Sequence, residues 1–513
     1  MPASFLHGVE VIEVSIGSVP VTVVKSAVIG LVGTAPAWAV ESPSVAAMPN
    51  TPALVSSSLD AANFGPLVRG YSIPYALAAI QAQGAGQAIV VNVFNPNIHF
   101  TALTASAFTF NTQGAISLGH MGVSNVVVTS NPAGTTYVAA TDYTLDAVNG
   151  AITIVPTGSG GHISAGASVL IAFDYADPTK VADSDVIGAI TSGVYTGMQA
   201  FQTTYGTMGF FPKILIAPGY SQDASVATAL AAMATKVRAV ALVDSPPATS
   251  AAAAVTNRGV TGNTFATSSN RIVLCYPQEV FYDTGIVPSG VMLNPSGLPL
   301  TSKFNANAVA PYSQWVAGAI AAKDLAQGYW WSPSNTPVDG MLGPDVQLYA
   351  SVVDASSDTN NLNAAGIVTV FNAFGTGLRV WGNRSSAYPT STAPDNFISV
   401  RRTMDIIEES LELAMLQFID QPISNALIDA ILASANAFIR SLIQRGALVA
   451  GAASFDPAEN PTTQIAAGQL VFDIDVMPPP PAERITFEAF IDMTLLQQLG
   501  QTSAITATAG ATA

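Results

Sequence analysis

Apolar and polar residues alternate with a period of two near both ends of this chain of 513 residues. Near the start, the apolar positions are Ile12, Val14 and Ile16. Near the finish, a first run covers residues 472–476, and a second contains Ile485, Phe487, Ala489, Ile491 and Met493. Such alternation predicts strands with one buried face. A terminal strand can pair within its own chain or be donated to the sheet of a neighbouring molecule.

Between the ends, continuous apolar runs bounded by Gly or Pro indicate strands that are covered on both faces. They occupy residues 27–36, 88–94, 213–219, 239–244 and 271–276. Residues 226–237 carry apolar side chains at helical spacing between two of these runs. This order predicts a βαβ unit with a right-handed crossover. The expected fold is therefore mixed α/β.

The composition changes between residues 95 and 180, which are rich in Thr, Ser, Gly and Val. Short strand patterns recur there at 125–129, 151–155 and 168–175. Asn149 and Gly150 form a strong hairpin signal, because both residue types tolerate positive φ. We expect an inserted antiparallel β-domain.

Residues 397–445 are typical of two helices. The first has one apolar face and an opposite charged face that includes Glu408, Glu409 and Glu412. Such an acidic stripe is most often a solvated helix face, although it can also dock a basic partner. We expect the second helix to begin at Pro422 and to be capped by Gly446.

The net charge is −16, and the 17 basic residues are scattered. No basic patch is visible, which argues against direct nucleic-acid binding. No stretch looks transmembrane, and membrane insertion is not expected. The N-terminus lacks the pattern of a signal peptide, so we expect synthesis in a cytoplasm. The single cysteine, Cys275, lies in an apolar run and is expected to be a buried thiol.

Motifs of catalysis and cofactor binding are missing from the sequence: there is no HExxH, CxxC, P-loop or GxSxG pattern. Asp223 and Asp244 follow strand ends, where α/β sheets often bind ligands. The more ordinary interpretation is that Asp223 caps a helix and that Asp244 begins a turn. Trp330 and Trp331 could stack on sugar or base rings, but we favour a role as packing anchors. We expect no enzyme, cofactor or metal.

Several segments, taken in order, resemble the contractile tail sheath family of phages and related injection machines. They are HGVEV at residues 7–11, AVIGLVGTAP at 27–36, NTPALV at 50–55, KILIAPG at 213–219, RAVALVD at 238–244, VAGAI at 316–320 and GYWWSPSN at 328–335. Two adjacent arginines at 401–402, which open a long helix, and the final strand pair complete the set.

The resemblance implies a multidomain protein. The expected parts are an N-terminal arm with a donated strand (1–25), a central α/β domain (26–94 and 181–395), the inserted β-rich surface domain (95–180), a core sheath domain (396–482), and a C-terminal strand arm with a disordered tail (483–513). N- and C-terminal segments would share the core domain. Gly17 would allow the first arm to bend. Pro478, Pro479, Pro480 and Pro481 would form a semi-rigid spacer before the second.

The resemblance also implies a structural function in a virion tail. Copies would form six-fold rings stacked helically around an inner tail tube, in contact with baseplate and tail terminator proteins, and would contract for genome ejection. Glu408, Glu409 and Glu412 would face the tube. The sheath of a headless bacteriocin or an injection system is an alternative. An enzyme that uses the central α/β unit, and a cell-surface protein with a glycan site in the inserted domain, are alternatives of other classes.

Overall fold

The computed structural model describes residues 21–40, 48–372 and 375–498. The chain divides into two compact units, residues 1–480 and 481–513. Ile12, Val14, Ile16 and Gly17, the expected donated strand and bend of the first arm, lie outside the described residues.

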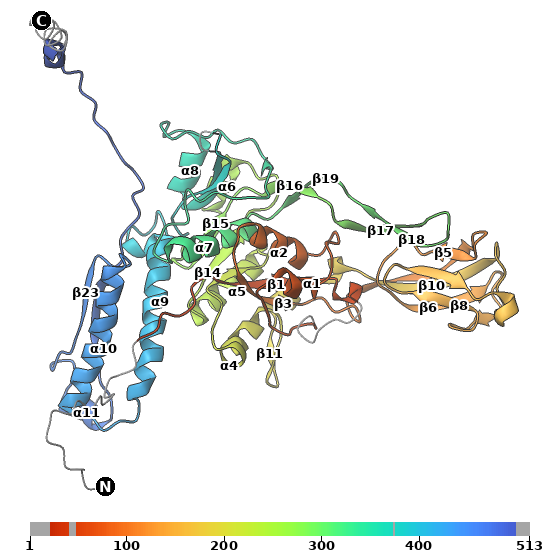
Figure 1. Ribbon diagram of the computed structural model, residues 1–513, viewed down its shortest axis with the longest axis horizontal. Coiled ribbons are helices and arrows are strands. Elements are labelled where there is room, and N and C mark those ends of the chain that lie inside the picture. The colour runs from red at the N-terminus through yellow and green to blue at the C-terminus, as the bar shows by residue number, and fades with distance from the viewer. Residues whose placement is uncertain (1–20, 41–47, 373–374, 499–513) are drawn as a thin grey trace, which may run out of the picture. The chain divides into compact units, whose positions relative to one another are not determined.

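An eight-stranded sheet lies at the centre of the first unit (Figure 1). Its spatial order is β2 (Ala53–Val55), β3 (Gln87–Asn92), β1 (Val28–Gly33), β13 (Ile214–Ile216), β14 (Val240–Asp244), β15 (Ile272–Cys275), β21 (Ile367–Asn372) and β22 (Leu378–Trp381). The inner strands are parallel, and β2 and β22 are antiparallel edge strands. The apolar runs in the sequence therefore form buried parallel strands, as predicted.

Helices cover both faces of this sheet. On one face, α2 (Ile73–Ala82) and α7 (Ser313–Gln327) share an apolar core with alternate residues of β1 and β13. On the other, α5 (Ala224–Lys236) and the 3-10 turn η5 (Gly197–Thr203) pack against the intervening residues. Shorter helices surround the sheet: α1 (Ser58–Ala62), α3 (Asp183–Ile187), α4 (Thr204–Met208), α6 (Ala251–Asn257) and α8 (Asp358–Ala364). The predicted βαβ unit is confirmed as β13–α5–β14.

Strand order reverses beside β1. From β1 the chain continues to β3 on one side, and it returns to β13 on the other side after the inserted domain. Connections that leave neighbouring strands in opposite directions open a crevice at the carboxyl ends of those strands. Here the crevice lies beyond β1 and β13.

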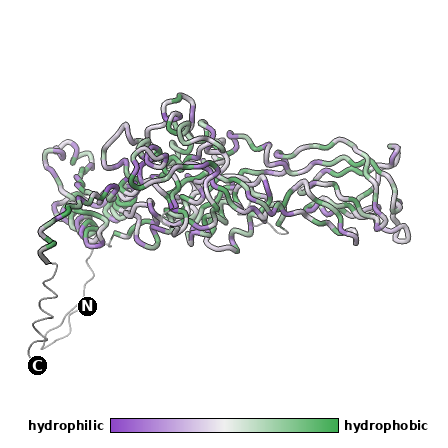
Figure 2. Tube along the Cα trace, turned by 90° about the horizontal axis from the view of Figure 1, so that it is seen from above, coloured by the Kyte–Doolittle hydropathy of each residue, from purple (hydrophilic) through white to green (hydrophobic). Residues whose placement is uncertain are grey.

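The inserted domain is antiparallel β-structure, as its composition predicted. One sheet has the order β4 (Phe100–Thr109), β10 (Ser168–Ala176), β6 (Val123–Ser130) and β7 (Thr136–Tyr137); the other has β5 (Ala115–Ser117), β9 (Ala151–Ile154) and β8 (Tyr143–Asp146). In Figure 2 the inserted domain lies at the right-hand end, where hydrophobic, intermediate and hydrophilic positions follow one another along the trace. Gly150, with φ of 59°, closes the hairpin between β8 and β9, as its sequence signal predicted.

A long ribbon connects the central region with the inserted domain, and the sequence patterns did not predict it. β16 (Glu279–Asp283) pairs with β19 (Ala306–Ala310), and β17 (Ile286–Leu293) pairs with β18 (Pro299–Lys303). The Met121 amide donates to the carbonyl of Pro288 at 3.1 Å, and the Ser117 hydroxyl donates to that of Val291 at 2.7 Å. The ribbon therefore adds a second attachment to the covalent ends of the insertion (Figure 1).

The C-terminal part of the first unit contains α9 (Ile398–Met415), α10 (Asn425–Gln444), α11 (Thr462–Ala466) and the antiparallel pair β23 (Ala450–Ser454) and β24 (Asp473–Met477). The start predicted for the second helix is wrong. Pro422 precedes α10, whose N-cap is Ser424, because its hydroxyl accepts the Leu427 amide. Gly446 follows the helix with φ of 78°, as predicted.

The apolar core of this part includes Leu411 of α9 and Phe438 and Leu442 of α10, and N-terminal residues Val21 and Val23 pack against it. N- and C-terminal segments therefore share one core. By length and composition alone, α10 is long and apolar enough to cross a membrane, contrary to the sequence expectation. Core helices of soluble proteins pass the same test.

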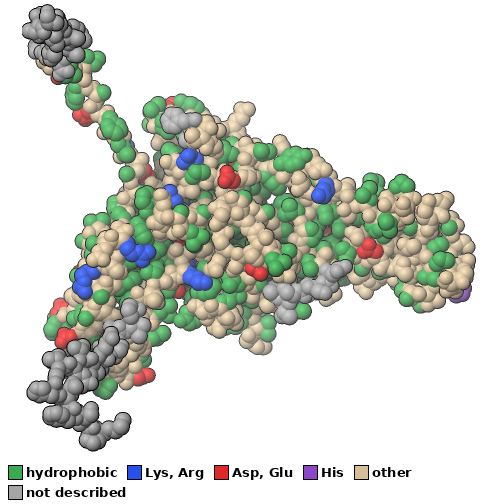
Figure 3. Space-filling model, in the orientation of Figure 1, with side chains coloured by type: hydrophobic (Ala, Val, Ile, Leu, Met, Phe, Trp, Pro, Cys, Tyr) green, Lys and Arg blue, Asp and Glu red, His purple; other side chains and the backbone are tan. Residues whose placement is uncertain are grey.

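In the second unit, residues 481–492 form no regular secondary structure, and 3-10 turn η8 (Met493–Gln498) follows. The alternating apolar residues are exposed: Ile485 by 70%, Phe487 by 90%, Ile491 by 98% and Met493 by 74%. Ala489 is exposed too. The predicted strand is thus absent from the isolated chain, where nothing described covers its apolar side chains. Figure 3 shows hydrophobic side chains along this segment.

Candidate functional site

Helix α9 is buried on its charged face as well as on its apolar face. Ile407 and Leu411 face α10, whereas Arg402, Asp405 and Glu409 on other sides of the helix are at most 7% exposed. Buried charges are tolerated only where they are paired and hydrogen-bonded. The charged face should therefore have partners on the central domain.

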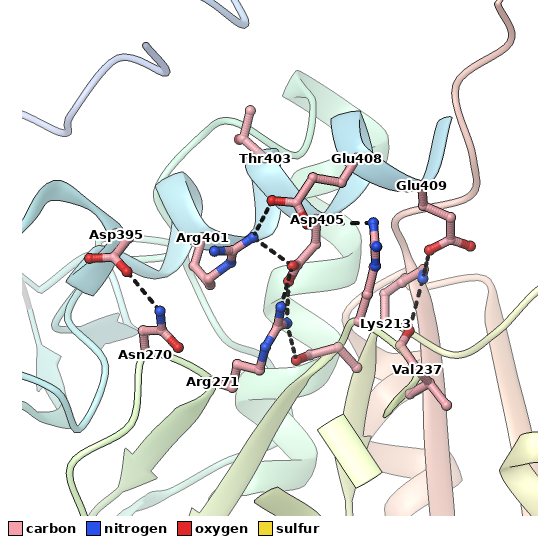
Figure 4. A network of polar contacts seen from close by, with 12 residues as sticks. Lys213, Val237, Asn270, Arg271, Asp395, Arg401, Thr403, Asp405, Glu408 and Glu409 are labelled. Carbon is pink, nitrogen blue, oxygen red and sulfur yellow. Dashed lines mark hydrogen bonds and ion pairs between the residues drawn. The ribbon is translucent and has the colours of Figure 1, made fainter. Parts of the chain in front are cut away.

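Asp405 is the centre of that pairing (Figure 4). Both of its oxygens accept from the Arg271 guanidinium at 2.7 Å. Arg271 is the residue immediately before β15. Arg401, one turn earlier on α9, donates to Asp405 at 2.8 Å and to Glu408 at 2.9 Å. Two guanidinium groups thus converge on one buried carboxylate. The bidentate pair with Arg271 connects α9 to the sheet and fixes the rotation of the helix.

Two further buried ion pairs flank this contact. Lys213, just before β13, donates to Glu409 and, at 3.1 Å, to the carbonyl of Val237. Burial lowers the pKa of Lys213, while the neighbouring Glu409 carboxylate opposes that effect. Arg402 binds both oxygens of Asp324 near the end of α7 and donates to the carbonyl of Ser26 at 3.1 Å. We call the pairs of Asp405, Glu409 and Arg402 the α9 charge network.

The expectation of a solvated acidic stripe is wrong for Glu409, whose side chain is only 9% exposed. The physical reason is Lys213, a cation that burial alone would strongly disfavour. Glu408 and Glu412, with side chains exposed by 38% and 61%, both form ion pairs with Arg238. A tube-facing role could therefore involve only these two carboxylates, and it stays a prediction.

The two tryptophans have different surroundings. Trp330 packs against the apolar core of α9 and α10, and the Arg445 guanidinium lies 5.4 Å from its ring centroid. Trp331 is 48% exposed, and Lys323 lies 5.6 Å from its ring. The structure therefore agrees with a packing role for Trp330 and corrects it for Trp331. The buried members of this segment are Tyr329, at 3% exposure, and Pro333.

The pair β23–β24 forms a sheet of only two strands. Among the described residues, no strand covers the outer edge of either one. The chain leaves this pair through the proline run, in which Pro478 is buried and Pro480 is exposed; the compact unit ends after Pro480. Unpaired backbone edges are sites where another strand can add.

The two aspartates of the enzyme alternative are structural. Asp223 caps α5, since its carboxylate accepts the Ser225 amide at 2.9 Å. Asp244 does not begin a simple turn: it is fully buried and accepts from the Ser313 amide at 2.7 Å and from the hydroxyls of Ser313 and Ser221 at 2.6 and 2.8 Å. Burial raises its pKa to about 6. Over the described ranges, no cluster of side chains suits a metal ion. Cys275 is a buried free thiol, as expected.

Comparison with known proteins identifies the family. The model of the phage tail sheath protein central domain matches residues 193–386, and that of the phage tail sheath C-terminal domain matches residues 390–492. The tail sheath protein of Burkholderia phage BcepMu is 45% identical over 495 residues, which cover 96% of this chain and 98% of that protein. This chain belongs to the phage tail sheath family. It is a structural protein of a contractile tail.

More distant relatives support the same assignment. The tail sheath protein of Escherichia phage P2 is 28% identical over 60% of this chain and 72% of its own length. A family of proteins of unknown function matches residues 97–183, which coincide with the inserted domain.

Solved structures show the shared fold. The contracted sheath of the PVC extracellular contractile injection system has a TM-score of 0.55 at 15% identity, over 96% of this chain and 100% of that one. The contracted helical sheath of the anti-feeding prophage has a TM-score of 0.54 at 16% identity, over 96% and 100% of the two chains.

Asp405→Asn should destabilise the subunit by about 3–5 kcal/mol, because two guanidinium groups whose side chains are at most 15% exposed lose their shared buried carboxylate. The measurement is urea unfolding followed by circular dichroism. The matched control is Glu412→Gln, whose exposed pair with Arg238 should contribute less than about 1 kcal/mol. Equal effects of the two substitutions would contradict the importance of burial.

Asp244 should make stability depend on pH. Its folded-state pKa of about 6 lies above its ordinary value of 3.8, so its stabilising contribution is present below pH 3.8 and is lost as the pH rises through 6. The free energy of unfolding of the wild type, minus that of Asp244→Asn, should therefore fall by on the order of 2–3 kcal/mol between pH 3.8 and 7. Parallel pH profiles of the two proteins would refute the raised pKa.

Proposed function

We propose that this sheath subunit assembles into helically stacked six-fold rings around an inner tail tube, and that contraction of the rings drives the tube through the host envelope for genome ejection. The observation that carries the proposal is the exposed apolar alternation of residues 485–493, together with the unpaired edges of β23 and β24. Family membership supports it.

The C-terminal segment is suited to strand donation. On a strand, Ile485, Phe487, Ile491 and Met493 project from one face, and each is at least 70% exposed in the isolated chain. Burial of such a side chain contributes roughly 1.5–3 kcal/mol. Addition to the β23–β24 edge of a neighbouring copy would bury these side chains and pair the backbone groups of both strands. The expected N-terminal strand at Ile12, Val14 and Ile16 would act in the same way.

The proline run is suited to link copies that change their relative orientation. Consecutive prolines favour an extended helix that rises about 3.1 Å per residue and acts as a semi-rigid spacer. Pro478 to Pro481 would thus keep the donated strand at a set distance from its own subunit. The α9 charge network would meanwhile hold each compact unit together, so that contraction reorients whole subunits.

The proposed partners are further copies of the chain, the inner tube, the baseplate and the tail terminator, without direct contact to nucleic acid or insertion into a membrane. We propose assembly in the host cytoplasm and no catalytic role. The phage relative with 45% identity favours a phage tail over a headless bacteriocin or a cell-anchored injection system.

Deletion of residues 483–513 should leave a folded subunit that no longer forms tubes. Electron microscopy of the purified protein would show striated tubes or stacked rings for the full chain and small particles for the truncated chain, with unchanged circular dichroism. Deletion of residues 503–513 alone is the control and should preserve the tubes. Loss of folding in the longer deletion would mean that the strand pairs within its own chain.

If α9 faces the tube, the double substitution Glu408→Lys and Glu412→Lys should weaken co-sedimentation with tube protein at least about tenfold, since roughly 1.4 kcal/mol of lost attraction suffices for that change. Asp429→Lys, at an exposed position of α10, is the control. Circular dichroism must show that loss of the Arg238 pairs leaves the fold intact. Undiminished co-assembly would place the tube contact elsewhere.

A further inference from the structure

A pocket of about 400 Å³ opens at the carboxyl ends of β1 and β13, in the crevice where the strand order reverses. Thr34 follows β1, and residues 218–220 follow β13; both line the pocket, together with Arg69, Tyr75 and Gln314. Volume and position are typical of small-ligand sites in open α/β sheets. The pocket is separate from the α9 charge network and from the strand edges.

The Arg69 side chain is held by an ion pair and a ring contact, and it retains N–H groups that can bond a ligand. Its Nε lies 3.3 Å from Asp283, and its guanidinium carbon lies 3.5 Å from the ring centroid of Phe304. Asp283 also accepts the Tyr75 hydroxyl at 2.8 Å and the Gly285 amide at 2.7 Å. In the described part of the chain, the two terminal nitrogens of Arg69 have no hydrogen-bond partner. Two parallel N–H groups of this kind match a carboxylate.

Gln314 is a second polar group without a partner. It is only 2% exposed, it lines the pocket, and its side-chain amide forms no hydrogen bond with any described residue. Its amide atoms are not among the fully buried polar atoms that lack a partner, so they reach the pocket space and can bond a ligand there. Gln314 is also the second residue of α7, a helix of 15 residues whose first amide, that of Ser313, already donates to Asp244. Among the described residues, the side-chain amide of Gln314 therefore remains as an unused donor at this end of the helix and favours a ligand group that accepts hydrogen bonds.

The remaining wall is largely aromatic. Tyr75, Tyr220 and Phe281 line it, and Val309 and Pro311 add apolar surface. The first turn of α2 offers little to a phosphate, because the amides of Ser72 and Ile73 already donate to Thr34. The site therefore combines one guanidinium group, paired through its Nε with the Asp283 carboxylate, one amide, the hydroxyl residues Thr34, Ser72 and Thr179, and apolar walls. It lacks the ring of backbone donors that phosphate groups prefer.

We propose that this pocket binds a carboxylate group, with Arg69 and Gln314 as its hydrogen-bond donors and the apolar walls around the carbon atoms that carry it. The carboxylate can come from a free small molecule or from an acidic side chain of a neighbouring copy, since the chain contains 33 acidic residues. The proposal does not require the sheath assembly to be as described above, because binding can be measured on the unassembled subunit.

The probe is benzoate, titrated by calorimetry into the full-length subunit below its polymerising concentration; benzamide and inorganic phosphate serve as comparison ligands. We expect benzoate to bind at least tenfold more tightly than benzamide or phosphate. Arg69→Gln should weaken benzoate at least tenfold and Gln314→Met at least threefold. Arg440→Gln, at an exposed position of α10, is the matched control and should change nothing.

Sheath polymerisation, followed by light scattering, distinguishes the two sources. Benzoate binding that depends on Arg69, with equal polymerisation of Arg69→Gln and wild type, identifies a free ligand. Two results together identify a carboxylate of the neighbouring copy. Arg69→Gln slows polymerisation at least fivefold whereas Arg440→Gln does not, and excess benzoate slows polymerisation of the wild type whereas benzamide does not. Preference for phosphate, or no effect of Arg69→Gln in either experiment, overturns the proposal.

Discussion

The packing of α9 between two layers is the constraint on which the rest of the first unit depends. Its apolar face joins α10, β23 and the N-terminal residues Val21 and Val23, and its charged face joins the central sheet. A helix with only one buried face would leave the C-terminal part attached to the sheet by a connecting loop. The α9 charge network instead binds the two parts with paired charges, whose separation would expose buried groups without compensation.

Buried charge pairs contribute little net stability, because the cost of desolvation cancels much of their attraction. Their advantage is orientation. Arg271 holds both oxygens of Asp405, and Arg402 holds both oxygens of Asp324, so small rotations of the helix break two hydrogen bonds at each position. An apolar contact would tolerate sliding. A subunit that transmits force in a contractile sheath benefits from a joint of this geometry.

The C-terminal part of the chain shows the opposite situation, because it exposes groups that have no partner among the described residues. Residues 485–493 expose large apolar side chains, and β23 and β24 expose backbone edges. Each feature is unfavourable in an isolated monomer, and the strand donation proposed above would satisfy both. The inserted domain is stabilised in a third way. Its strands bury a small core of their own, and the β17–β18 ribbon attaches the domain to the central region.

Patterns along the chain predicted those parts of the fold whose signals lie in neighbouring residues. Continuous apolar runs identified the parallel strands, and the change of composition after residue 95 identified the insertion. The same reasoning failed where the outcome depends on distant residues. Glu409 looks solvated until Lys213, 196 positions away, is brought beside it. The β16–β19 ribbon, the exposure of Trp331 and the juxtaposition of Arg69 with Gln314 are of the same kind. Periodicity records which side of an element is apolar, but the partner of a charge or of a strand edge is set by chain segments that only tertiary structure brings together.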